Sequence, residues 1–112
     1  MSCAAGLAAL EVLLRDRLCE RAALLGERLL TELEEFIDHG GLVVVRGMGL
    51  LIGLEFASPV ACARFVERAF ASGLILNWTL HRDAVVRLAP PLILSDAEAE
   101  RALAAISAAL DE

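Results

Sequence analysis

The sequence contains no lysine and no tyrosine, and all ten of its basic residues are arginines. Without lysine, the chain cannot form a lysine Schiff base or build a phosphate-binding P-loop, which requires Gly-Lys-Ser/Thr. Sixteen acidic residues give a formal net charge of -6 at pH 7. Because phosphate binding needs clustered positive charge, this balance argues against a nucleic-acid partner.

Long hydrophobic runs are also missing, although hydrophobic residues make up 58% of the 112 residues. The longest uncharged run, Ala69 to His81, is shorter than the roughly 17 residues that a membrane span needs. No positive residue precedes the apolar Leu7–Leu10, so a signal peptide is not expected. The apolar excess reflects either an Ala- and Leu-rich composition of the helices or a surface that another domain or subunit covers.

Cysteine is scarce: Cys3, Cys19 and Cys62 are far apart and form no CxxC pair. With only His39 and His81 beside them, we expect no metal site. The cysteines are predicted to be small buried apolar residues of a protein in a reducing compartment, which indicates a cytoplasmic location.

The first third of the chain is predicted to be helical over residues 3–38. Between Asp16 and Asp38 the apolar residues recur every three or four positions, whereas residues 4–14 favour a differently phased apolar face. We therefore expect a break near Leu14–Arg17. His39-Gly40-Gly41 is predicted to end the helix, because glycine tolerates the left-handed conformation of a C-terminal cap.

The rest of the chain is expected to fold into strands and two further helices. Turn and cap signals bound these elements: Gly47-Met48-Gly49 joins two strands as a hairpin, Ser58-Pro59 starts a helix that Ser72-Gly73 ends, and Ser95 with Glu98 forms a capping box. Ala89-Pro90-Pro91 ends the sheet, since proline lacks a backbone N–H. The expected ranges are strands 42–46, 50–56, 74–77 and 84–88, a connection over Trp78–Asp83, and helices from 59 to about 71 and 96–110.

This order, αββαββα, predicts one α+β domain over residues 1–112, with a small, mainly antiparallel sheet and helices packed on one face. The other face of the sheet is then left for solvent, another domain or a partner subunit.

Four places could carry chemistry. The glycines of Arg46-Gly47-Met48-Gly49 allow a ligand to approach the backbone, but they equally suit a hairpin turn. Arg87, alone in an apolar strand, either binds an anion in bidentate geometry or pairs with a surface acid. Trp78 lines a pocket or anchors a loop, with His81 in a solvated turn. The run Glu34-Glu35 with Asp38 reads as a solvated helix face, and no catalytic constellation is evident.

Taken together, these motifs resemble the C-terminal part of class III pyridoxal-phosphate-dependent aminotransferases, the acetylornithine, ornithine and 4-aminobutyrate aminotransferase group. The resemblance covers nearly the whole chain. Its matching pieces are Cys3–Leu13, Leu25-Gly26-Glu27-Arg28-Leu29, Val45–Gly53, Gly73–Asn77 and Val85–Leu92.

The resemblance implies the small C-terminal domain of a fold-type I enzyme that moves an amino group between an amino acid or amine and a 2-oxo acid, with glutamate and 2-oxoglutarate as one pair. It implies that Arg87 binds a substrate carboxylate, and that pyridoxal phosphate is held by a lysine of a large domain absent from this chain. It also implies a homodimer.

The chain alone is then expected to be inactive, with no catalytic or cofactor-binding residue of its own. The alternative is a free-standing α+β carboxylate-binding or regulatory module.

Overall fold

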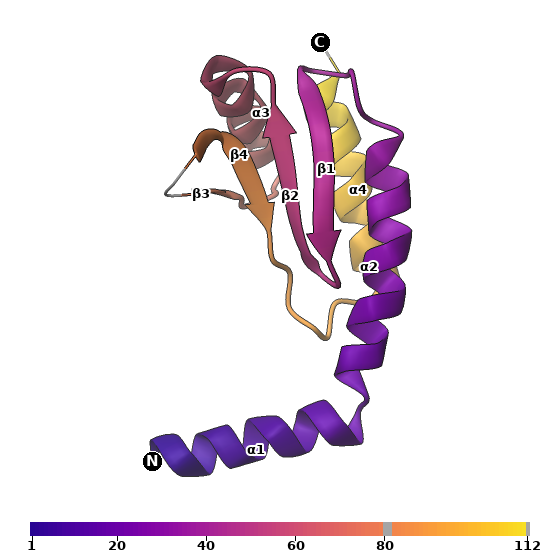
Figure 1. Ribbon diagram of the computed structural model, residues 1–112, viewed down its shortest axis with the longest axis vertical. Coiled ribbons are helices and arrows are strands. Elements are labelled where there is room, and N and C mark those ends of the chain that lie inside the picture. Colours follow the sequence, from indigo (N-terminus) through magenta and orange to yellow (C-terminus); the bar gives the residue numbers. More distant parts are fainter. Residues whose placement is uncertain (80–81, 112) are drawn as a thin grey trace.

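The computed structural model describes residues 1–79 and 82–111, with residues 77–79 described by their backbone (Figure 1). The expected order is confirmed, with the first helix divided in two as predicted. The elements are α1 (Ser2–Arg15), α2 (Leu18–Glu34), β1 (Leu42–Met48), β2 (Leu51–Phe56), α3 (Pro59–Ala71), β3 (Asn77–Thr79), β4 (Arg82–Leu88) and α4 (Asp96–Leu110).

The strands form one antiparallel sheet in the order β1-β2-β4-β3. Helices α2, α3 and α4 cover one face of the sheet, so the α+β class is confirmed (Figure 1). Strand β2 shows the two-sided pattern best: Ile52, Leu54 and Phe56 are buried toward the helices, while the residues between them are more exposed. The core therefore lies between this face and the three helices.

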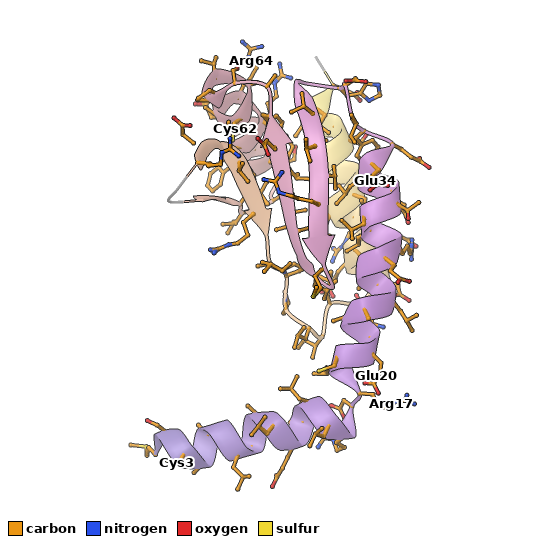
Figure 2. All side chains as sticks on the ribbon, in the orientation of Figure 1. Cys3, Arg17, Glu20, Glu34, Cys62 and Arg64 are labelled. Atoms are coloured by element: carbon orange, nitrogen blue, oxygen red, sulfur yellow. The ribbon has the colours of Figure 1, made fainter. Side chains whose placement is uncertain are left out.

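The predicted break between the first two helices is confirmed at Arg17, whose φ of 50° and ψ of 44° are left-handed. Beside it, Arg17 Nε donates to Glu20 Oε1 at 3.1 Å (Figure 2). Helix α1 leads away from the sheet at a wide angle to α2 and has no buried residue (Figure 1). Leu7, Leu10 and Leu14 on α1 are all exposed. The apolar surface of α1 is thus uncovered in this chain.

The end of α2 differs from the prediction. The helix stops at Glu34 and not at residue 38, because the last turn tightens: the backbone N–H of Phe36 donates to Leu33 O at 3.1 Å. Gly40 and Gly41 have φ of 56° and 83°, so the glycines turn the chain into β1 and do not cap the helix.

The hairpin turn is shorter than predicted. Strand β1 continues through Gly47 to Met48, which pairs with Leu51, so only Gly49 and Leu50 form the connection. Gly49 adopts a φ of 55°, as a two-residue turn requires of its first residue.

Helix α2 packs against this turn through Gly26. A Cβ atom at Gly26 would lie 2.1 Å from the carbonyl oxygen of Gly49, so only a glycine lets the helix and the turn come this close. Leu50, the other residue of the turn, is buried beside them.

The third strand is displaced from its predicted range. Residues 74–76 are not a strand, and β3 begins at Asn77, which pairs with Arg87. Extending that register would place Leu74 opposite Pro90, which has no N–H to donate. Leu74 and Leu76 instead pack against the core. Strand β4 begins at Arg82, two residues earlier than predicted.

The predicted boundaries of the last two helices are confirmed. Ser58 Oγ accepts from the backbone N–H of Ala61 at 3.2 Å at the start of α3. At the start of α4, Ser95 and Glu98 form the expected capping box. Among the described helices, none is long and apolar enough to cross a membrane.

We expect Gly26→Ala to lower the free energy of unfolding by about 1–3 kcal/mol, because the added methyl group forces α2 away from the Gly49 turn. This loss should appear even though alanine is favoured over glycine inside a helix by about 1 kcal/mol. Urea denaturation followed by circular dichroism measures the difference.

Gly6→Ala on α1 is the matched control, because a Cβ atom there meets nothing within 4 Å. It should leave the stability unchanged or raise it. Equal effects of the two substitutions would show that the contact between Gly26 and Gly49 does not limit the packing.

Candidate functional site

The face of the sheet opposite α2, α3 and α4 is here called the open face. One row across it runs from Arg46 on β1 through Gly53 on β2 to Arg87 on β4, since Gly53 pairs with both arginines. In the next row on this same face, two residues along β2, Glu55 pairs with Val44 on one side and with Val85 on the other. Two arginines and one glutamate therefore lie within two adjacent rows.

Arg87, the predicted binding residue, is exposed on this face. Among the described residues, its guanidinium forms no hydrogen bond or ion pair with another side chain. The alternative that Arg87 pairs with a surface acid therefore finds no support among the described residues. Exposure also removes the desolvation penalty that a buried arginine would carry, so the side chain is stable without a fixed partner.

Glu55 is the partner of two other arginines. Arg46 Nη1 donates to Glu55 Oε2 at 2.5 Å, and Arg82 Nη1 lies 3.4 Å from Glu55 Oε1. The hydrogen bond from Arg46 is the main cause that lowers the pKa of the Glu55 carboxyl below its ordinary value; the charge of Arg82 lowers the pKa further and burial opposes both. Glu55 is therefore a charged, doubly paired carboxylate at neutral pH.

A mainly apolar cavity of about 600 Å³, with Glu98 and Arg101 also in its lining, adjoins the end of β4. Its lining comes from β4 and the prolines after it, from residues 72–76, and from α2 and α4; it includes Arg87, Leu88, Pro90, Ile75, Leu76 and Leu103. Arg87 thus lies between a charged row on the open face and an apolar hollow at the end of the sheet. A carboxylate with a short carbon chain suits such a boundary.

The hairpin glycines serve packing. Besides Gly49 in the turn, Gly47 lies within β1, where a Cβ atom would meet Leu51 O at 2.5 Å. Of the two interpretations of Arg46-Gly47-Met48-Gly49, the structure therefore supports the hairpin and not a loop that binds a ligand. The Arg46 side chain forms an ion pair with Glu55.

The other candidates lie away from the open face or outside the described chain. Trp78 belongs to β3 and pairs with Val86, while its side chain and the whole of His81 lie outside the described residues. Glu34, Glu35 and Asp38 are exposed at or just after the end of α2, as predicted for a solvated helix face. Figure 2 labels Glu34.

The prediction for the cysteines is correct only for Cys62, which is buried on α3. Cys3 and Cys19 are exposed, because α1 buries nothing and position 19 points away from the apolar stripe of α2. No cluster of three His, Cys, Asp or Glu residues suited to a metal ion occurs in residues 1–79 and 82–111.

Sequence reasoning missed Glu55 and Arg82 as parts of this site. The period of two in β2 could have placed Glu55 on the same face as Gly53. The strand register, which brings Arg46 beside Glu55, is not contained in that pattern.

Comparison with known proteins identifies the family. The profile of the class-III aminotransferase family matches residues 1–110. Ornithine aminotransferase of Bacillus cereus strain Q1 is 41% identical over 110 residues, which are 98% of this chain and 26% of that protein. The chain therefore belongs to the class-III aminotransferases and spans about a quarter of the length of the relatives it matches.

Solved structures agree with this assignment. Acetylornithine aminotransferase from Elizabethkingia anophelis superposes with a TM-score of 0.88 at 28% identity, over 96% of this chain and 29% of that one. Ornithine aminotransferase from Toxoplasma gondii, described with partial occupancy of pyridoxal phosphate at its active site, gives a TM-score of 0.87 at 29% identity, over 96% of this chain and 26% of that one. The fold is thus that of a part of these aminotransferases.

The ion pairs of Glu55 predict a pH dependence of stability. Because the pKa of Glu55 is lower in the folded than in the unfolded chain, its stabilising effect is fully present above about pH 4.3, the ordinary value, and is lost as the pH falls through the folded pKa. Urea denaturation between pH 2 and pH 7 should show Glu55→Gln less stable than the parent at neutral pH and equal to it at the acid end. A stability difference that does not change with pH would contradict the assignment.

Proposed function

We propose that this chain supplies the substrate-carboxylate site of a pyridoxal-phosphate-dependent aminotransferase, with Arg87 as the binding group. The observation that supports this most is that the guanidinium of Arg87, in a chain of the class-III family, is exposed and has no acid partner among the described residues. The complete enzyme would move an amino group between an amino acid or amine and a 2-oxo acid, with glutamate and 2-oxoglutarate as one pair.

The chemistry of Arg87 suits this task. Its planar guanidinium presents two parallel N–H groups to the two oxygens of a carboxylate, and its charge is permanent. A hydrogen bond to a charged group contributes about 1.5–3 kcal/mol. Holding the carboxylate in this geometry also fixes the direction of the substrate's carbon chain, which lowers the entropic cost of reaching a reactive orientation.

Gly53 leaves space beside this arginine. It separates Arg46 from Arg87 in their row, and a Cβ atom at Gly53 would meet only Arg46 O at 3.7 Å and a Val85 methyl group at 3.9 Å, both ordinary contacts. The surface above Gly53 is therefore free for the carbon chain of a small substrate.

Pyridoxal phosphate is proposed for the complete enzyme and not for this chain alone. The chain has no lysine, so its residues do not fit the covalent attachment that the family uses. The part of the relatives that this chain does not match, about three quarters of their length, would then provide the anchor. The contribution of the present residues is limited to binding and orienting the substrate.

The proposed partners are a large domain and a second subunit. Helix α1, which buries none of its residues and exposes Leu7, Leu10 and Leu14, offers an apolar surface for one of them. This uncovered surface favours a missing partner over composition alone as the reason for the apolar excess.

We also propose a cytoplasmic location. The exposed thiols of Cys3 and Cys19 suit a reducing compartment, where thiols are kept from forming disulfides.

Titration of the isolated chain with 2-oxoglutarate should perturb the Arg87 Nε–Hε resonance, with a dissociation constant in the millimolar range or weaker, since one charge-assisted pair supplies most of the affinity. The resonance is assigned by its loss in Arg87→Met. In calorimetric titration, which does not depend on that resonance, Arg87→Lys keeps the charge but loses the bidentate geometry and should bind 2-oxoglutarate more weakly than the parent chain. Micromolar binding that Arg87→Met abolishes would favour a free-standing module instead.

The isolated chain should show no aminotransferase activity, and borohydride reduction in the presence of pyridoxal phosphate should give no lysine adduct by mass spectrometry. Joining the chain to the portion of the Bacillus cereus ornithine aminotransferase that it does not match should yield activity. In this chimaera Arg87→Met should lower kcat/KM for the 2-oxo acid about 10- to 100-fold, the kinetic equivalent of about 1.5–3 kcal/mol. An active chimaera that is indifferent to Arg87→Met would refute the proposed role.

A further inference from the structure

Glu55 is a register neighbour of two arginines on the open face. Gly53, two residues before it on β2, pairs with Arg46 on one side and with Arg87 on the other. Arg46 and Arg87 are therefore both diagonal neighbours of Glu55, at a separation that long side chains bridge. The two pairings differ in type, because a residue of an inner antiparallel strand forms a hydrogen-bonded pair on one side and a non-hydrogen-bonded pair on the other. Both guanidinium groups nevertheless start from positions that the Glu55 side chain can reach.

The structure pairs Glu55 with only one of these two arginines. Its Oε2 accepts from Arg46 at 2.5 Å, and its Oε1 lies 3.4 Å from Arg82 near the start of β4. Both carboxylate oxygens are engaged, and the lowered pKa keeps the group ionised. The Glu55 side chain is 21% exposed, against 52% for Arg46 and 66% for Arg82. The carboxylate is thus enclosed by its two partners.

The sheet's other acidic residue among the described ones is on β4 and lies farther from Arg87. Asp83 is four residues before Arg87 along the strand, a separation of roughly 13 Å between Cα atoms at the usual rise per residue. Glu55 is therefore the acidic residue of the sheet best placed to neutralise Arg87.

We propose that Arg46 and Arg82 act as positioning residues that hold Glu55 away from Arg87, so that the guanidinium of Arg87 stays available for the carboxylate of a ligand. The inference rests on the proposed function, because it explains why Arg87 has no acid partner among the described residues. In this proposal Arg46, in the β1–β2 hairpin, acts on the site by holding Glu55 and does not itself contact the substrate.

Removing Arg46 releases Glu55 Oε2, and the nearest register alternative is Arg87. An ion pair formed there would have to be broken before a ligand binds. Because exposed ion pairs are weak, Arg46→Met should weaken binding of a carboxylate by no more than about fivefold.

The first measurement needs no ligand. In NMR spectra of the 112-residue chain, the Arg87 Nε–Hε resonance should move in Arg46→Met and return to its original position in Arg46→Met with Glu55→Gln. Arg64→Met is the matched control: it removes the same charge from α3, away from the open face, and should leave the resonance in place (Figure 2). An Arg87 resonance that is the same in the parent and in Arg46→Met would overturn the inference.

The second measurement is a double-mutant cycle on 2-oxoglutarate binding. Glu55→Gln alone should have little effect, because Glu55 is already neutralised, whereas Arg46→Met should weaken binding and the double substitution should restore it. Additive effects, or an equal loss in Arg64→Met, would show that only overall charge matters and would overturn the inference. Circular dichroism melting of each variant separates these effects from unfolding.

The two proposals fail differently. If the parent chain and the chimaera are both indifferent to Arg87, the proposed function fails, and the resonance of Arg87 without ligand still decides whether Arg46 restrains Glu55. If that resonance does not respond while Arg87 binds 2-oxoglutarate, the proposed function stands and the positioning role of Arg46 is wrong.

Discussion

The close contact between Gly26 and Gly49 is the constraint on which the rest of the fold depends. It lets α2 rest directly on the backbone of the β1–β2 turn, where any larger residue would separate the two. This contact fixes the height of the hairpin along the helix, and the apolar stripe of α2 then meets Val45, Leu54 and their neighbours in one core. Once the hairpin is fixed, its register decides which side chains reach the open face.

The sheet consequently separates apolar and charged residues between its two faces. The face toward the helices carries the core, and no polar or charged residue is buried among the described residues. The open face carries Arg46 and Arg87, which stay in contact with water, and Glu55, whose partial burial is offset by its ion pairs with Arg46 and Arg82. The same arrangement that stabilises the fold therefore leaves one face available for charged ligands.

Much of the fold could be predicted from local signals. Cap residues gave the correct starts of α3 and α4 because a serine side chain and a backbone N–H interact within one turn. The break at Arg17 followed from a change of phase in the apolar pattern. The displaced third strand and the early end of α2 could not be found in this way, since both depend on what the segment meets elsewhere, such as Pro90 opposite Leu74.

Only part of the candidate site could be predicted from the sequence. Arg87 stood out as a single charge in an apolar strand, and its resemblance to a family arginine gave it a role. Whether it has a partner depends on the cross-strand register of β2 and β4, which no local pattern contains. Glu55 and Arg82 therefore emerged only from the structure.

The position of Arg87 on an inner strand has a thermodynamic consequence. Its backbone pairs with Gly53 of β2 on one side and with Asn77 of β3 on the other, and Pro90 and Pro91 fix the chain soon after. The main chain at this residue has already lost its conformational entropy during folding. A ligand that binds here immobilises only the Arg87 side chain and not its backbone, so the loss of conformational entropy by the protein on binding is small.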